Sequence, residues 1–196
     1  MHHYPGQLFL LSGPSAVGKT TIESRLRQHM AHLVKIVTYT TREPRPHEQN
    51  GIHYHFVTKR HFQDMIEDHA FLEWAVVHTQ LYGTPKQTII DALKAGKHIA
   101  LIVDVQGAMR IKEQLPHDCH LIFIAPDSLE NLRKRLGHRQ GGTDAEIQVR
   151  LDDAQKEMAF RDQYDYVVVN KEGHIAQTVA EIARIIQNVA KAKRHA

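Results

Sequence analysis

Residues 13–20 read GPSAVGKT, a GxxxxGK sequence followed by a threonine. A short apolar run, Gln7–Ser12, precedes this loop, and Thr20–Met30 follows with apolar residues at helical spacing, so strand, loop and helix are predicted. Glycines at these positions let backbone N–H groups converge on phosphate oxygens at the start of the helix. Lys19 then reaches the β- and γ-phosphates, and the Thr20 hydroxyl ligates Mg²⁺. The loop therefore predicts binding of a nucleoside triphosphate.

Such a loop occurs in GTPases, in ATP-driven machines and in kinases of small molecules, and alone it does not choose among them. A chain of 196 residues is too short for a large machine, and it contains no NKxD-like segment of the kind that reads guanine in a GTPase. A small-molecule kinase is the class that remains. Its acceptor must be recognised by residues outside the loop.

The composition is that of an ordinary globular protein, with 42% hydrophobic and 24% charged residues, which excludes disordered, collagen-like and coiled-coil chains. The formal net charge is only +3, from basic residues spread along the chain, so no nucleic-acid partner is expected. The apolar run Leu8–Leu11 is too short to span a membrane. Because Cys119 is the single cysteine, no intramolecular disulfide forms. We expect a cytoplasmic protein with no membrane association.

Sixteen histidines are the unusual feature of the composition. His53 and His55 flank Tyr54 at strand spacing, but the chain contains no HExxH sequence and no second cysteine. We therefore expect the histidines on the surface and in loops rather than in a metal site.

Four further short runs, rich in Val and Ile, are predicted as buried strands: 34–39, 99–103, 121–125 and 166–169. They are continuously apolar rather than alternating, as in a parallel sheet that is covered on both faces. Helices are predicted between and after them, at 107–115, 129–136, 146–161 and 174–193. This alternation predicts an α/β fold with a doubly wound parallel sheet of the P-loop NTPase type.

The character of the sequence changes between residues 40 and 97. The segment TTREPRPHEQNG is too rich in proline and charge for a core strand, and it is followed by two short half-exposed strands, 53–57 and 71–77, around a helix at 60–68. We predict a small α+β insertion on the edge of the sheet. The expected division of the single domain 1–196 is a core of 1–39 and 98–196, an insertion of 40–97 and a lid of 137–145.

The lid is predicted as a mobile loop, because GHRQGGTD at 137–144 has two adjacent glycines and no apolar residue. Thr143 and Glu146 have the spacing of a capping box that starts the next helix.

Arg42 and Arg45 lie three residues apart in the loop of the insertion. Exposed arginines are usually solvated charges, and the alternative is a pair of guanidinium groups that converge on a phosphate. The surrounding motifs favour the second. The chain resembles guanylate kinases from Leu8 to Asn170, with the family's motifs in the same order and at the same spacing: TYTTREPRPHEQNGIHYHF, FLEWAVVHTQLYGT, DVQGA and RLGHRQGGTDAEIQVRL.

This resemblance implies transfer of the γ-phosphoryl group of ATP to GMP, giving ADP and GDP, with Mg²⁺ bound together with ATP. It implies that Glu73 and Thr84 face the base. A carboxylate offers two acceptors to the N1–H and N2–H₂ donors of guanine, whereas adenine would leave it unpaired. The phosphate of GMP would be held by Arg42, Arg45, Tyr54 and Tyr82. Further residues of the acceptor site would be Thr38, Glu48, Gly83 and Asp104.

Two of these residues also have structural interpretations from the sequence alone. The position of Glu73 in the sequence fits either an exposed residue of a strand or a residue that binds the base. Thr84 suits the cap of a helix with Pro85 in its first position, and this role is compatible with contact to the base. Asp104 ends an apolar strand, where α/β folds place ligand-facing groups, and the resemblance puts it near the acceptor and, through water, near Mg²⁺.

On the donor side, the resemblance implies catalytic roles for Lys19, Arg45, Arg139 and Arg150, the last two from the lid. The spacing alone also fits a salt-bridged helix surface. Asn170 would lie near the adenine. The expected ATP-binding residues are Gly13, Pro14, Ser15, Ala16, Val17, Gly18, Lys19, Thr20, Thr21, Arg135 and Asn170.

Four residues depart from the family's usual pattern. Ala16 and His47 each stand where a glycine is usual, and Thr38 stands where serine is usual. Ile102 replaces an acidic residue two positions before Asp104, and we expect this loss to lower turnover while leaving binding intact. Two alternatives therefore stay open: a kinase for another nucleoside monophosphate, and a catalytically weak module that binds a phosphorylated ligand. The sequence does not indicate an oligomeric state.

Overall fold

The computed structural model describes residues 3–77, 79–140 and 143–194, with the backbone alone at 138–140 and 194. Its larger sheet has five parallel strands in the order β2-β7-β1-β8-β9. These strands are β1 (Leu8–Ser12), β2 (Leu33–Val34), β7 (His98–Ile102), β8 (Cys119–Pro126) and β9 (Tyr166–Asn170). The prediction of a doubly wound parallel sheet is confirmed.

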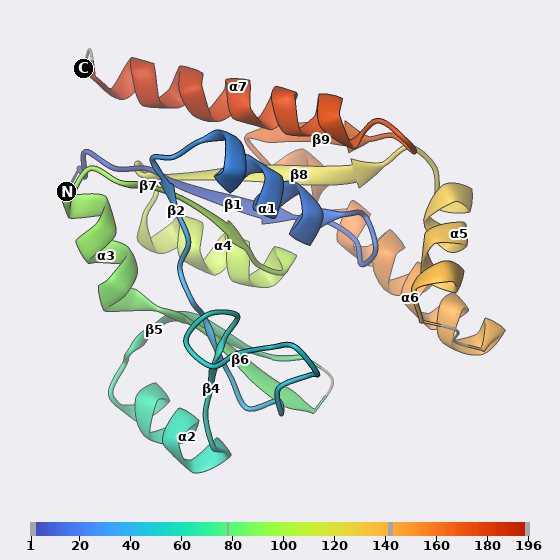
Figure 1. The fold of residues 1–196 in the computed structure, drawn as a ribbon, viewed down its shortest axis with the longest axis horizontal. Coiled ribbons are helices and arrows are strands. Elements are labelled where there is room, and N and C mark those ends of the chain that lie inside the picture. The colour runs from blue at the N-terminus through green and yellow to red at the C-terminus, as the bar shows by residue number, and fades with distance from the viewer. Residues whose placement is uncertain (1–2, 78, 141–142, 195–196) are drawn as a thin grey trace.

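Helices cover both faces of this sheet (Figure 1). Successive side chains of the central strand β1 point to opposite faces, so Phe9 and Leu11 pack with Ile22 on one side, while Leu8 and Leu10 pack with other helices on the other. Burial on both sides explains why the strand is continuously apolar. One face is covered by α1 (Lys19–His29) and α7 (Ile175–Arg194), and the other by α3 (Lys86–Lys94) and α4 (Val105–Gln114).

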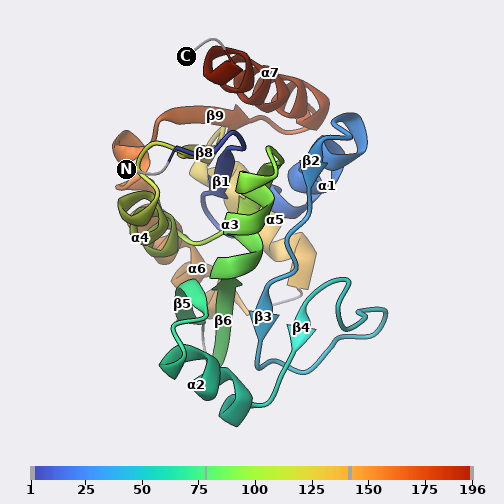
Figure 2. The ribbon, with the colours of Figure 1, turned by 90° about the vertical axis from the view of Figure 1, so that its left-hand side faces the viewer.

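A second sheet of four strands lies beside the first, in the order β4-β3-β6-β5 (Figure 2). Strands β3 and β4 are parallel, and the other pairs are antiparallel. The rings of Phe62 and Phe71 stack with centroids 4.6 Å apart and form its small core. Its elements are β3 (Tyr39–Thr40), β4 (His55–Phe56), α2 (Lys59–Glu67), β5 (Phe71–Val77) and β6 (Gln80–Pro85).

Two local predictions in this region are wrong. The strand expected at 34–39 is split into β2 and β3, which belong to different sheets, because the chain crosses from one sheet to the other between them. Thr84 does not cap a helix: it lies in β6, and α3 begins at Lys86 with Pro85 as the capping residue and no side-chain cap. The Thr84 side chain is buried and donates instead to Glu73.

Two helices form the far end of the core, α5 (Leu129–Gln140) and α6 (Asp144–Met158). The capping box is confirmed, since Glu146 N donates to Thr143 Oγ1 at 3.3 Å and Thr143 N donates to Glu146 Oε2 at 2.8 Å. The predicted loop begins too early, because α5 continues through Gln140. Residues 141 and 142 of the expected lid lie outside the described residues. Helix α6 ends before the predicted residue 161, and a 3-10 turn, η1 (Arg161–Gln163), follows it.

The expectation of surface histidines is wrong for His98 in β7, which is buried, while His120 in β8 is half-buried. Gln7 N donates to His98 Nδ1 at 3.1 Å, and Gln7 Oε1 lies 2.9 Å from His120 Nε2. His98 is buried, and its partner satisfies its polar atom. The neighbouring Cys119 is a buried free thiol, and burial raises its pKa to about 12. In the part of the chain that is described, no helix has the length and apolarity needed to cross a membrane.

Candidate active site

The loop at 13–20 joins β1 to α1 through left-handed backbone. Gly13, Ala16 and Gly18 have φ angles of 135°, 62° and 103°. A Cβ at position 13 would lie 2.1 Å from the carbonyl oxygen of Ile124 in β8. Only glycine therefore lets the loop pass over the end of the neighbouring strand.

Lys19 opens α1, and its ammonium donates to the carbonyl oxygens of Gly13 and Pro14, the second at 2.9 Å. The ammonium thus lies across the loop, at the positive end of the helix. Thr20 and Thr21 follow in the first turn and are exposed. A phosphate chain in this loop would meet backbone N–H groups, the helix N-terminus and one ammonium group.

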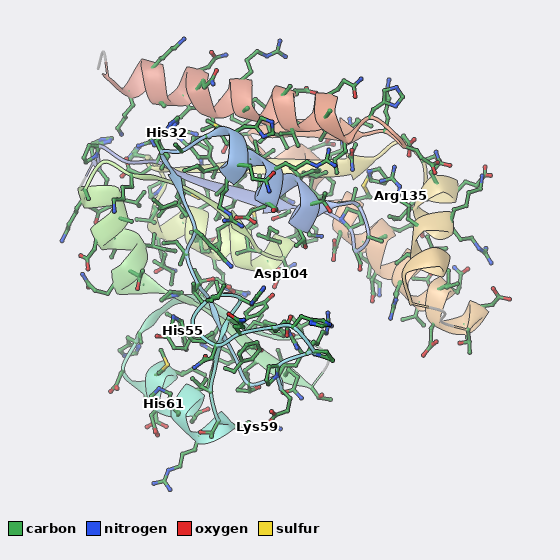
Figure 3. All side chains as sticks on the ribbon, viewed as in Figure 1. His32, His55, Lys59, His61, Asp104 and Arg135 are labelled. Atoms are coloured by element: carbon green, nitrogen blue, oxygen red, sulfur yellow. The ribbon has the colours of Figure 1, made fainter. Side chains whose placement is uncertain are left out.

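Asn170 fixes the loop to the rest of the core. It is buried, its Nδ2 donates to Val17 O at 2.8 Å, and its Oδ1 accepts from Thr178 Oγ1 at 3.0 Å. Arg135 Nη2 donates to Asn170 O at 3.1 Å, and Figure 3 shows Arg135 at the α5 end of the sheet. The polar atoms of Asn170 are thus engaged by the protein. The sequence analysis did not identify Thr178 as the partner of Asn170, because Thr178 has no motif that distinguishes it from the other residues of the last helix.

The expected lid arginines belong to the helical pair α5 and α6. These helices pack through Leu132, Leu136, Leu151 and Ala154, and Ala16 of the loop packs against the same cluster. Arg150 lies on α6 and is half-buried. Arg139 lies in α5, and its side chain is outside the described residues. The structure therefore connects the helical pair to the phosphate loop directly.

The expected phosphate site of the acceptor lies in the second sheet. Arg42 donates to both carboxylate oxygens of Glu48, at 2.9 and 3.0 Å, and its guanidinium lies 5.6 Å from the ring centroid of Tyr54. The rings of Tyr54 and Tyr82 are 6.0 Å apart. The backbone N–H of Arg45 also donates to Glu48, at 2.7 Å. Three of the expected residues, Arg42, Tyr54 and Tyr82, are therefore side by side.

Glu48 has a different environment from its neighbours in this site. Its carboxylate faces Arg42 and the Arg45 backbone, and its hydrogen bonds from Arg42 lower its pKa. An ionised carboxylate repels a phosphate, so in this arrangement Glu48 orients Arg42. Thr38 lies in the crossing segment and accepts from His55 N through its carbonyl at 2.8 Å, and Gly83 packs against the ring of Phe71.

Glu73 is the buried carboxylate of this sheet, with 9% of the residue exposed. Its Oε1 accepts from Thr84 Oγ1 at 3.1 Å, and its Oε2 accepts from Arg110 Nη2 at 3.3 Å. Burial raises the pKa of Glu73, as does the charge of Asp104, while Arg110 and Thr84 oppose this shift. The interpretation of Glu73 as an exposed strand residue is wrong. The sequence did not reveal Arg110, because an arginine on a helix carries no motif.

Asp104 lies where the core meets the second sheet (Figure 3). It caps α4, since its Oδ1 accepts from Gly107 N at 2.8 Å, and it is otherwise exposed. The Thr20 hydroxyl and the Asp104 carboxylate are hard oxygen donors of the kind that Mg²⁺ accepts. These residues therefore fit the expected ion, whereas Ile102 offers no ligand and packs against the apolar cluster on the α1 side.

A carboxylate that the sequence analysis missed lies near Lys19. Burial raises the pKa of Glu157 in α6 to about 6, with Asp104 reinforcing the shift and Lys19 opposing it. Its sequence signal is weak: Glu157 is three residues after the buried Ala154, on the inward face of the helix. The hydroxyls of Ser12 and Tyr164 are buried in the same region.

Comparisons with known proteins identify the family of this chain. The model of the guanylate kinase family matches residues 6–189. The chain belongs to the guanylate kinase family. The guanylate kinase of Wolbachia sp. subsp. Brugia malayi (strain TRS) is 45% identical over 181 residues, which are 92% of each chain. The guanylate kinase of Thermotoga maritima is 38% identical over 195 residues, covering 96% of this chain and 94% of its own.

A solved member of the guanylate kinase family supports the fold directly. The crystal structure of guanylate kinase from Anaplasma phagocytophilum has a TM-score of 0.76 at 31% identity, and the match covers 93% of this chain and 85% of that one. The resemblance inferred from the motifs is therefore confirmed over nearly the whole chain.

Proposed function

We propose that this protein is an ATP:GMP phosphotransferase that produces ADP and GDP. The observation that carries the proposal is Glu73, a buried carboxylate that Thr84 and Arg110 hold from two sides. A fixed pair of carboxylate oxygens complements the N1–H and N2–H₂ donors of guanine, and adenine offers an acceptor at N1 instead. Membership of the guanylate kinase family supports the same substrates.

In this mechanism the protein aligns two nucleotides and neutralises charge, without a covalent intermediate. An oxygen of the GMP phosphate attacks the γ-phosphorus of ATP in line, and ADP leaves. Lys19 holds the phosphates of ATP in the loop. Arg42, Tyr54 and Tyr82 hold the GMP phosphate, with Glu48 orienting Arg42. Arg45, Arg139 and Arg150 stabilise the charge on the group in transfer.

Mg²⁺ is part of this proposal as the companion of ATP. Thr20 would hold it directly and Asp104 through water, and both donors suit the ion. When bound, Mg²⁺ supplies positive charge beside the phosphate oxygens. Because Ile102 supplies no carboxylate there, we propose that the rate is lower than a second acidic residue at this position would allow.

We also propose a division into a core of 1–39 and 98–196, an insertion of 40–97 and a lid of 137–145. The two separate sheets support the first division. We place the protein in the cytoplasm, with ATP and GMP as its partners and no nucleic acid. A buried free thiol at Cys119 is compatible with a reducing compartment.

The test is a coupled assay of ADP release with Mg²⁺-ATP and each of GMP, dGMP, AMP, CMP and UMP. We expect turnover selective for guanine nucleotides. In Glu73→Gln one acceptor becomes a donor, so kcat/KM for GMP should fall by about two to four orders of magnitude. Glu67→Gln is the matched control, because it replaces an exposed carboxylate of α2 by a carboxamide. It should leave kcat/KM unchanged.

Two results would contradict the proposal. Turnover on none of the monophosphates, with ATP still bound, would identify a binding module for a phosphorylated ligand. Turnover on another monophosphate would mean that the pocket around Glu73 reads a different base.

A further inference from the structure

Three residues of α4 and its cap face the carboxylate of Glu73. Asp104, Gly107 and Arg110 are spaced by three along the helix, so they share one side of it. Asp104 influences the charge state of Glu73, Gly107 lies against its carboxylate, and Arg110 donates to it. Helix α4 covers the large sheet of the core, whereas Glu73 belongs to the second sheet. The base-reading carboxylate is thus placed by a helix of the other structural unit.

Gly107 brings the helix backbone close to the carboxylate. A Cβ at this position would lie 2.8 Å from Glu73 Oε2 and 2.9 Å from its Cδ. No side chain fits between the helix and the carboxylate, so one side of Glu73 is closed by α4.

Arg110 contacts the same strand at two points. Its Nη2 lies 3.3 Å from Glu73 Oε2 and 3.4 Å from the carbonyl oxygen of Trp74. The Arg110 side chain is 45% exposed, whereas that of Glu73 is 7% exposed. The guanidinium therefore reaches the buried carboxylate from the surface, and its planar group is held by two acceptors of β5.

The hydrogen-bonding capacity of Glu73 explains what this arrangement achieves. A carboxylate has about four lone-pair positions, two on each oxygen. Thr84 occupies one position on Oε1 and Arg110 one on Oε2. Beyond these two hydrogen bonds one position is left on each oxygen, and two acceptor positions are the number that the N1–H and N2–H₂ donors of guanine need.

We propose that Arg110 is a positioning residue for base selection, which fixes the Glu73 carboxylate so that both of its oxygens face the incoming guanine. The inference rests on the proposed function, because it assigns a role within the same acceptor site. Without Arg110, Oε2 loses its hydrogen-bond donor, and the orientation of the carboxylate depends on Thr84 at the other oxygen and on the packing of Gly107. The charge of Arg110 also offsets the repulsion between the Glu73 and Asp104 carboxylates.

A purely structural role for Arg110 makes a different prediction. If Arg110 only tied α4 to β5, its loss would lower stability and reduce the apparent kcat through the amount of folded enzyme, while the KM for GMP and the KM for ATP would stay unchanged. A positioning role affects the interaction with GMP and leaves the constants for ATP unchanged.

The experiment compares Arg110→Met, Arg110→Lys and the control Arg60→Met, which removes an exposed positive charge from α2. For Arg110→Met we expect the KM for GMP to rise about tenfold, with kcat within twofold and the KM for ATP unchanged. Arg110→Lys should recover part of the loss, since an ammonium still donates to Oε2. Titration calorimetry with GMP alone should show the same order of affinities without catalysis.

Thermal melting of each variant separates the two roles. A KM for GMP within twofold of the parent in Arg110→Met overturns the inference, as does an equal effect in Arg60→Met. A fall in melting temperature with no change in GMP affinity also overturns it. If the parent protein neither binds nor phosphorylates GMP, the proposed function fails first and the inference falls with it.

Discussion

The proposed phosphate loop and the proposed base site would achieve recognition by opposite means. The loop is one contiguous stretch, and its contacts to phosphate would come from backbone N–H groups that glycines bring together. The base site is assembled from side chains of β5, β6 and α4, far apart in the sequence. A site made of local backbone is encoded by a few adjacent residues, whereas one made of side chains depends on how distant elements pack. The two regions therefore differ in how a substitution affects them.

The largest expected effect is at Lys19, in the loop. Lys19→Met removes the ammonium that spans Gly13 and Pro14, and kcat should fall by about three orders of magnitude or more. GMP affinity, measured by calorimetry, should stay within twofold because the base site uses other elements. Lys134→Met on the exposed face of α5 is the control. A parallel loss of GMP affinity would show that the two regions are not independent.

The contrast between a local backbone site and a site of distant side chains also explains which features could be predicted from the sequence. The loop, β1 and α1 follow from local patterns, and so do the buried strands β7, β8 and β9. The split of residues 33–40 between two sheets does not, because nothing local marks the point where the chain crosses. The acceptor residues were predicted through resemblance to a family rather than through spacing, and they stay a prediction.

Other features of the site lay beyond the sequence because they exist only through contact. Arg110 acquires its proposed role from α4 lying against β5, and the pKa of Glu157 depends on its burial and on the charges of Lys19 and Asp104. Thr84 was misjudged as a cap because its partner is eleven residues away, on the neighbouring strand. Residues that pair across two elements lie at no fixed separation in the sequence, so the sequence alone does not predict such pairs.

The intermediate effect concerns Glu157, whose charge interacts with both regions. Its pKa is about 6 in the folded protein against an ordinary value of 4.5, so the folded state binds more protons between these values. The protonated carboxyl group of Glu157 therefore favours the folded state, and this stabilisation is lost as pH rises through about 6 and the buried group ionises. Glu157→Gln removes this penalty, and the variant should be more stable than the parent by about 2 kcal/mol at pH 8 and equal at pH 4.

Chemical denaturation at pH 4, 6 and 8 measures this difference. Glu113→Gln, at an exposed position on α4, is the matched control for replacing a carboxylate by a carboxamide. A constant difference between Glu157→Gln and the parent across the three pH values would contradict the assignment of the shift to burial of the carboxylate.

The smallest effect compares the phosphate loop with the acceptor loop between β3 and β4, since each contains a residue other than glycine in left-handed backbone. The φ angles are 62° at Ala16 and 73° at His47, where the family usually has glycine. Left-handed backbone costs such a residue about 1–2 kcal/mol. Substitution by glycine relieves this cost, but the greater freedom of glycine in the unfolded chain offsets part of the gain in stability. His47 is exposed, whereas Ala16 packs on the cluster between α5 and α6.

His47→Gly should therefore raise the free energy of unfolding by about 0.5–1 kcal/mol. The His47 side chain is exposed, so its removal costs little packing. Ala16→Gly also loses a methyl group worth about 0.8 kcal/mol when buried, so its net change should be close to zero. Urea denaturation of the two variants and the parent measures both. Equal gains at the two positions would mean that the Ala16 methyl contributes little to stability, and that the hydrogen bonds from Lys19 and Asn170 hold the phosphate loop without it.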